Sequence, residues 1–156
     1  MAKRNKKRER GARSGTLRGL PHSLPSLEMA YRLQERAAGV GFDWPDTRGP
    51  LDKVREELRE LEAELSAEHT APRSPLPGIK EEIGDLLFAV VNLSRKLAVD
   101  PGAALERTND KFTRRFEGIE RLAQERGLQL GRASLEELDR LWDETKAAEG
   151  GHGHSL

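Results

Sequence analysis

The 156-residue sequence contains no cysteine, and only 4% of its residues are aromatic. Without cysteine, disulfides, zinc–thiolate sites and thiol catalysis are excluded. Few aromatic residues and few runs of β-branched residues argue against a sheet protein. No stretch approaches the roughly 18 apolar residues of a membrane span, and no signal-peptide core follows the basic start. These absences favour an all-α protein, which we expect to be cytoplasmic and not in a membrane.

The formal net charge is zero, but the charges are unevenly distributed. Residues 1–18 contain eight lysines and arginines and one glutamate, so the remaining chain carries a net charge of −7. We expect residues 1–23 to be a disordered basic arm that could contact nucleic acid electrostatically. The acidic remainder would need cations, such as bound metal ions, to handle polyanionic phosphates.

Apolar residues spaced by three and four predict five helices. The predicted helices cover residues 27–39, 51–68, 79–98, 101–126 and 135–148. Ser26 is the expected N-cap of the first helix, and Ser134 with Glu137 forms a capping box before the last. The third helix is apolar on nearly every side, so it should be buried in the centre of the fold or in an interface.

The domain organisation follows from these helices. We predict an antiparallel helical bundle of about five helices, forming one domain over residues 24–148. Residues 149–156, which hold three glycines and two histidines, are expected to be a disordered tail.

Two pairs of carboxylates occupy neighbouring predicted helices. Glu57 and Glu60 are one turn apart beside the apolar stripe of the second helix, and Glu82 and Asp85 repeat that spacing on the third. In an antiparallel pair of helices the four would converge, within a mismatch of one to two helical turns. Crowded carboxylates need a cation, and oxygen ligands select Mg²⁺ or Mn²⁺. The spacing also fits two solvated acidic faces, so both interpretations stay open at this point.

Basic and aromatic residues alternate on the fourth and fifth helices. Lys111 and Arg115 lie one turn apart, where they could clamp a phosphate chain or form a solvated basic face. Phe112 and its neighbour Phe116 are expected in the core. Trp142 is equally suited to the core and to stacking on a nucleobase.

Residues 24–148 resemble the catalytic domain of the MazG-type pyrophosphohydrolases, within the all-α nucleoside triphosphate pyrophosphohydrolases. The resemblance rests on four segments in the family's order: residues 41–45 (GFDWP), 53–60 (KVREELRE), 81–88 (EEIGDLLF) and 109–116 (NDKFTRRF). Better-known family members carry two tandem copies of this domain, whereas this chain has one.

The resemblance implies an Mg²⁺-dependent enzyme that pairs as a homodimer. Its reaction would convert nucleoside or deoxynucleoside triphosphates to monophosphate and pyrophosphate, with broad specificity that suits cleaning of the nucleotide pool. The implied metal ligands are Glu57, Glu60, Glu82 and Asp85. The positions where nucleotide contacts are expected are Lys53, Glu56, Glu81, Asp85, Lys111, Arg115, Trp142 and Lys146. Among these, Glu56 is a candidate base, Lys111 and Arg115 resemble the triphosphate clamp, and Trp142 with Lys146 resembles the position that closes over the nucleotide.

Two alternatives remain. One is a relative with a single substrate, such as a dCTP or dUTP pyrophosphatase or phosphoribosyl-ATP pyrophosphohydrolase. The other is a non-catalytic helical module that binds nucleic acid or a partner through its basic arm.

Overall fold

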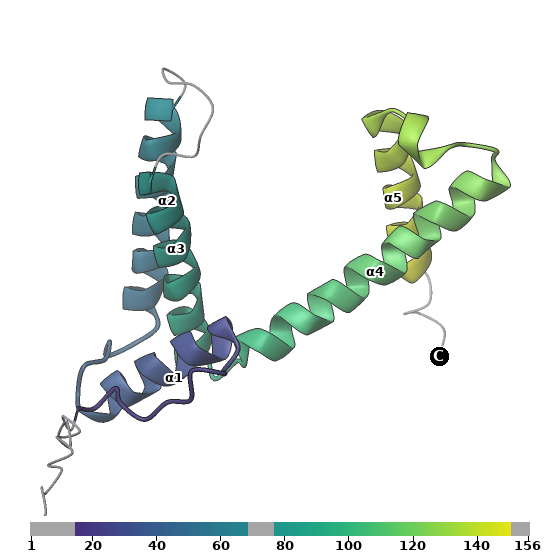
Figure 1. Ribbon diagram of the computed structural model, residues 1–156. Coiled ribbons are helices and arrows are strands. Elements are labelled where there is room, and N and C mark those ends of the chain that lie inside the picture. Colours follow the sequence, from purple (N-terminus) through teal and green to yellow (C-terminus); the bar gives the residue numbers. More distant parts are fainter. Residues whose placement is uncertain (1–14, 69–76, 151–156) are drawn as a thin grey trace, which may run out of the picture. The chain divides into compact units, whose positions relative to one another are not determined.

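The computed structural model describes residues 15–68 and 77–150, and within these ranges the chain is helical with no strand. The elements are α1 (Ser26–Gly39), α2 (Arg48–Glu68), α3 (Pro77–Lys96), α4 (Pro101–Glu125), the 3₁₀ helix η1 (Leu130–Arg132) and α5 (Leu135–Gly150) (Figure 1). The predicted all-α class is therefore confirmed. Among the described residues, no helix combines the length and the apolar character that a membrane span requires.

The helix starts differ from the predictions at α1, α2 and α3. The prediction of Ser26 as the N-cap of α1 was wrong, because Pro25 occupies that position and Ser26 is the first helical residue. Helix α2 begins at Arg48, before Pro50, whose missing N–H costs nothing within the first turn. At α5 the capping box is confirmed: the Ser134 N–H donates to the Glu137 carboxylate at 2.8 Å, and the Glu137 N–H donates to the Ser134 hydroxyl at 3.2 Å.

The ends of α1, α3 and α4 share one local geometry. Gly41, Ala98 and Gly127 have positive φ angles of 91°, 55° and 64°, which turn the chain out of each helix. After α3, the Val99 N–H donates to the Ser94 carbonyl at 2.9 Å, which closes the turn around Ala98. This turn ends α3 at Lys96, two residues before the predicted end.

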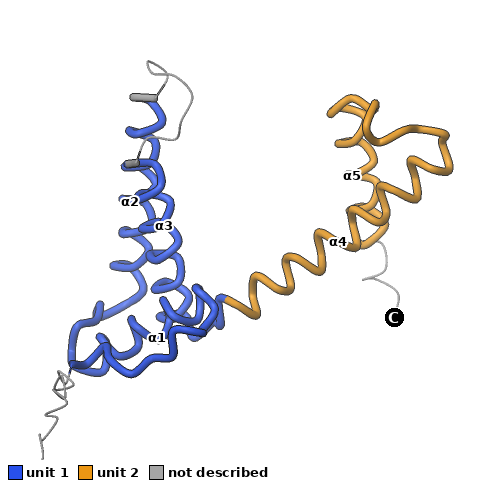
Figure 2. The backbone as a smooth tube through the Cα atoms, viewed as in Figure 1, with its two compact units in different colours: residues 1–101 blue, residues 102–156 orange. Residues whose placement is uncertain are grey.

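The chain forms two compact units, Met1–Pro101 and Gly102–Leu156 (Figure 2). In unit 1, α3 packs against both α2 and α1, with the side chains of Ile79, Ala89 and Val91 in the core. In unit 2, Ile119 and Ala123 on α4 pack with Leu141 on α5. The packing of all five helices into one bundle stays a prediction.

Helix α3 is not buried on nearly every side within unit 1, so the packing of this unit alone does not meet that expectation. Ala89 and Val91 are buried, but Ile83, Leu87 and Val90 expose 42–54% of their surface. Because these exposed residues recur at spacings of three and four, they form one face of the helix. The remaining expectation for this apolar face is an interface.

Candidate metal centre

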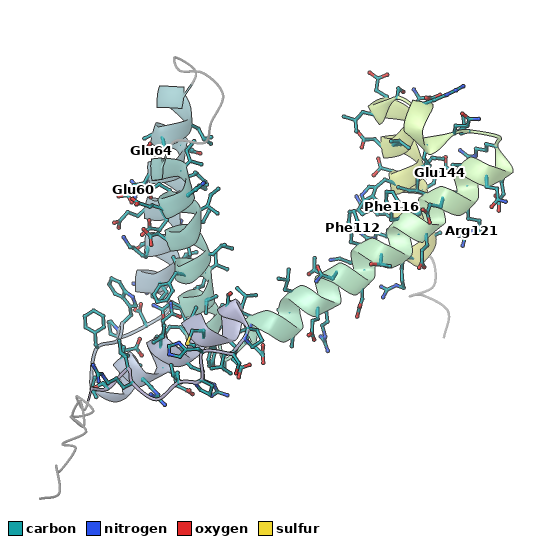
Figure 3. All side chains as sticks on the ribbon, viewed as in Figure 1. Glu60, Glu64, Phe112, Phe116, Arg121 and Glu144 are labelled. Carbon is teal, nitrogen blue, oxygen red and sulfur yellow. The ribbon has the colours of Figure 1, made fainter. Side chains whose placement is uncertain are left out.

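Five carboxylates gather where α2 packs against α3. Carboxylate oxygens of Glu57, Glu82 and Asp85 all lie within 4.8 Å of one another, and those of Glu56, Glu57 and Glu60 form a second such group. Glu57 belongs to both groups and exposes only 5% of its side chain. Glu60 lies one turn before Glu64 on α2 (Figure 3). The structure thus brings all four predicted ligands together around Glu57, and their role as ligands stays a prediction.

A close helix contact sets this alignment of α2 and α3. A Cβ atom on Gly78, in the first turn of α3, would lie 2.5 Å from Glu64 Oε2. Because glycine has no side chain, the start of α3 lies directly against the second half of α2. Glu82 and Asp85, one and two turns further along α3, then lie level with Glu57. The mismatch of one to two turns expected from the predicted helix ends is therefore absent.

Lys53 balances part of this negative charge. Its Nζ lies 2.6 Å from Glu57 Oε1 and 2.7 Å from Glu56 Oε1. Hydrogen bonds to Glu56 and then to Glu57 raise the pKa of the Lys53 ammonium above its usual range. Lys53 was predicted to contact the nucleotide, and in the structure it holds two of the carboxylates.

Glu82 is the least compensated member of the group. Its Oε2 is buried, and no described residue donates a hydrogen bond to it. Burial first, and then the charges of Glu60, Glu57 and Asp85, raise the pKa of this carboxyl above its usual value. A buried oxygen without a donor, beside further carboxylates, is the environment that a hard divalent cation stabilises. The residues present therefore fit an Mg²⁺ ion.

Glu81, a predicted nucleotide contact, is exposed on α3 and belongs to neither acidic group. The expectation for Glu81 came from the family resemblance. Adjacent residues on a helix point about 100° apart, so Glu81 does not share the direction of Glu82.

Unit 2 contains the predicted basic and aromatic site residues. The Phe112 ring lies 5.5 Å from the Trp142 ring and 6.0 Å from the Phe116 ring, and the Arg115 guanidinium lies 5.6 Å over the Trp142 ring. Phe112 and Phe116 both lie on α4 (Figure 3). Both phenylalanines are exposed, so the expectation that they form the core was wrong. The structure brings Arg115 and Trp142 into one cluster of α4 and α5, in a cation–π geometry.

The cations around this cluster differ in their partners. Arg115 Nε donates to Glu149 Oε2 at 2.7 Å, and Lys146 lies 3.5 Å from Asp143. Lys111 is exposed. The pKa of Glu149 is lowered mainly by the hydrogen bond from Arg115 and to a smaller extent by the charge of Lys111. Glu149 was missed by the sequence interpretation because it was assigned to the tail, whereas α5 continues to Gly150.

Comparison with known protein families identifies the region that holds the acidic groups. Residues 50–119 match the model of the MazG nucleotide pyrophosphohydrolase domain. This segment is a MazG domain. The predicted family resemblance is confirmed. The description of the family, a nucleotide pyrophosphohydrolase domain, agrees with the expectation of an enzyme of that class. All five clustered carboxylates, Lys111 and Arg115 lie inside the MazG domain, whereas Trp142 and Lys146 lie beyond it.

Curated relatives extend the similarity over most of the chain. The chain is 42% identical over 144 residues to the nucleoside triphosphate pyrophosphohydrolase/pyrophosphatase MazG of Thermotoga maritima, covering 92% of this chain and 52% of the relative. It is 40% identical over 149 residues to the nucleoside triphosphate pyrophosphohydrolase of Escherichia coli K12, covering 94% and 54%. Bacillus subtilis YabN, an uncharacterized protein, is 45% identical over 136 residues, 87% of this chain and 27% of YabN. The chain therefore spans about half the length of the first two relatives.

Proposed function

We propose that this chain hydrolyses nucleoside and deoxynucleoside triphosphates to the monophosphate and pyrophosphate, with Mg²⁺ as cofactor and with broad base specificity. The observation that carries the proposal is the convergence of Glu57, Glu60, Glu82 and Asp85 inside a MazG domain. The names of the Thermotoga and Escherichia relatives support the same reaction.

The four convergent carboxylates would hold the metal ion, with Glu57 shared between the two groups. When bound, Mg²⁺ neutralises phosphate charge and polarises the phosphoryl group that reacts. Lys53 fixes Glu57 through an ion pair of 2.6 Å, so this ligand is oriented before any substrate arrives. An oriented ligand set lowers the entropic cost of binding.

Glu56 is the proposed general base. It lies next to the metal ligands, and its side chain is 48% exposed, so water reaches it. Lys53 donates a hydrogen bond to Glu56 at 2.7 Å, which holds the carboxylate in position to accept a proton from the attacking water. Hydrolysis of the bond between the α- and β-phosphates then yields the monophosphate and pyrophosphate.

Residues of unit 2 are proposed to contact the substrate. Lys111 and Arg115, one turn apart on α4, would bind phosphate oxygens and stabilise charge on the departing pyrophosphate. Trp142, with Lys146 one turn later on α5, would close over the nucleotide. The Arg115 guanidinium already lies over the Trp142 ring in a cation–π contact. Glu81, exposed beside the metal ligand Glu82, would contact the nucleotide from the surface of α3.

A product assay tests the reaction. The protein is incubated with Mg²⁺ and each of the eight common NTPs and dNTPs, and nucleotides and phosphates are separated. Glu57→Gln and Glu60→Gln remove ligand charge with little change in shape, and Glu62→Gln, exposed on the same helix and outside both acidic groups, is the matched control.

Monophosphate plus pyrophosphate from several substrates, reduced at least about 100-fold in the ligand variants and kept in the control, supports the proposal. Turnover of one nucleotide alone would replace broad specificity with a single-substrate enzyme. No turnover, or diphosphate plus orthophosphate made equally by the variants, would refute the catalytic role and leave a binding module.

We also propose that a second copy of the chain covers the exposed apolar face of unit 1. On α2, Leu51, Leu58 and Leu65 recur every seven residues and each exposes 38–46% of its surface. Ile83, Leu87 and Val90 continue this surface on α3, the helix packed beside it. Apolar residues that repeat every seven positions are typical of helices that pack along their length against a facing helix. In a symmetric dimer the same surface of both copies forms this contact.

Molecular mass from light scattering tests the homodimer. Leu87→Glu places a charge in the proposed interface and should yield the monomer. Leu135→Glu, at an exposed position of α5 in unit 2, is the control and should leave the mass at twice that of one chain. A monomeric wild-type protein would refute the dimer.

A further inference from the structure

In unit 2, the carboxylate of Glu149 meets the guanidinium of Arg115. Glu149, near the end of α5, accepts a hydrogen bond from Arg115 Nε at 2.7 Å, and its other oxygen lies 3.8 Å from Arg114 Nε. The Arg115 side chain is only 20% exposed, so this ion pair is partly protected from screening by water. We propose that Glu149 is a positioning residue, which orients Arg115 to bind a phosphate of the substrate.

The ion pair follows from a close approach of α4 and α5. A Cβ atom on Gly118 would lie 2.6 Å from Thr145 Cγ2, so the two helices come together at these residues. Arg115 lies one turn before Gly118 on α4, and Glu149 lies one turn after Thr145 on α5. Both residues are therefore within about 6 Å, along their helices, of the point of contact. A long arginine side chain can bridge the two helices there.

Two contacts fix the plane and one edge of the Arg115 guanidinium. Its central carbon lies 5.6 Å from the centre of the Trp142 ring, and its Nε donates to Glu149. Among the described residues, no hydrogen bond occupies its two Nη atoms. These atoms carry four of the five N–H groups of a guanidinium and can bind phosphate oxygens in pairs. Glu149 therefore holds one edge of Arg115 and leaves the donors of the other edge available.

One carboxylate does not cancel the positive charge of this cluster. Arg115, Arg114 and Lys111 all act on Glu149, and together they lower its pKa, with the hydrogen bond from Arg115 as the largest cause. Three cations around one anion leave an excess of positive charge, which attracts a polyanion. The cluster can thus bind phosphate while the ion pair between Glu149 and Arg115 stays intact.

Orientation before binding matters because a free arginine side chain has many conformers. Ordering such a side chain during binding lowers the affinity. Glu149 and Trp142 restrict Arg115 in the free protein, so a phosphate has less to order when it binds. Loss of the Glu149 side chain should weaken phosphate binding roughly 3- to 10-fold, the effect of ordering about one side chain.

Calorimetric titration with inorganic pyrophosphate and Mg²⁺ tests this role. Glu149→Ala removes the contact and should bind pyrophosphate roughly 3- to 10-fold more weakly than the wild-type protein. Glu149→Gln keeps an oxygen that accepts from Arg115 Nε and loses a negative charge, so it should bind at least as tightly as the wild-type protein. Glu136→Ala, the same change at an exposed position of α5, should bind as the wild-type protein does.

The same titration in an Arg115→Ala protein shows whether Glu149 acts through Arg115. In that background Glu149→Ala should cause no further weakening, since the residue that it positions is absent. Equal weakening by Glu149→Ala in both backgrounds would overturn the positioning role.

Fluorescence quenching by acrylamide reports on the orientation of Arg115 without a ligand. The chain has two tryptophans, so Trp142 is the only one left in a Trp44→Phe protein. Glu149→Ala should increase the quenching, because Arg115 then covers the Trp142 ring for less of the time. Glu149→Gln should leave the quenching unchanged. Unchanged quenching in Glu149→Ala would overturn the orientation of Arg115 by Glu149.

The titration has three outcomes that overturn the inference. Glu149→Ala could bind pyrophosphate as the wild-type protein does, or more tightly, which would make Glu149 a competitor of the phosphate. Absence of binding by the wild-type protein would remove the phosphate role of Arg115, on which the inference rests as part of the proposed function. The product assay separates the two proposals. Hydrolysis with equal affinities refutes only the role of Glu149, and the expected affinities without hydrolysis refute only the reaction.

Discussion

Replacing Glu82 with glutamine should have opposite effects on stability without and with Mg²⁺. In the metal-free protein, Glu82 Oε2 is buried, has no donor among the described residues, and lies close to the carboxylates of Glu57 and Asp85. The amide of Glu82→Gln removes one negative charge and offers two N–H groups to those neighbours. The metal-free variant should therefore melt at a higher temperature than the wild-type protein.

Saturating metal should reverse the order. An ion present at 100 times its dissociation constant stabilises the folded state by about 2.7 kcal/mol. For a unit of roughly 100 residues this raises the melting temperature by about 10 °C or more. If loss of one ligand weakens binding about 100-fold, the same Mg²⁺ concentration contributes only about 0.4 kcal/mol to the variant.

Thermal melts followed by circular dichroism at increasing Mg²⁺ concentration measure both effects. The two melting curves should cross, with the variant more stable in chelator and the wild-type protein more stable in Mg²⁺. Glu62→Gln should follow the wild-type protein throughout. A lower melting temperature for Glu82→Gln in chelator would contradict the electrostatic reasoning, and an undiminished response to Mg²⁺ would remove Glu82 from the metal site.

Three further predictions concern stability, each measured by thermal melting. Hydrogen bonding from Arg95 lowers the pKa of Asp43 from 3.8 to about 2. The stabilising contribution of the Asp43 carboxylate is therefore present above pH 4 and is lost as the pH falls through about 2. Asp43→Asn should lower the melting temperature at pH 6 but not at pH 2. Ala98→Gly should raise stability by about 1 kcal/mol, because alanine holds a φ of 55° there, and an unchanged or lower value would contradict this. Gly118→Ala should cost about 1–3 kcal/mol, because its Cβ would lie 2.6 Å from Thr145 Cγ2 and the overlap outweighs the gain of about 1 kcal/mol in helix propensity; a stabilised variant would show that α5 can move away.

Features that depend on neighbouring residues in the sequence could be predicted. The all-α class and the capping box of Ser134 and Glu137 follow from spacing and local hydrogen bonds. The pairs Glu57 with Glu60 and Glu82 with Asp85 follow from the helical repeat alone. Their convergence needed one further fact, the contact between Gly78 and Glu64, which fixes the alignment of two helices.

Burial was the property that sequence spacing could not give. An apolar residue such as Leu87 has the same pattern whether its own chain or another molecule covers it. Phe112 and Phe116 illustrate the same problem in unit 2, where both are exposed and Phe112 contacts Trp142, a residue that packs against the core. The sequence interpretation missed Glu149 for another reason. A glutamate at a helix end next to glycines gives no signal that it forms an ion pair with Arg115.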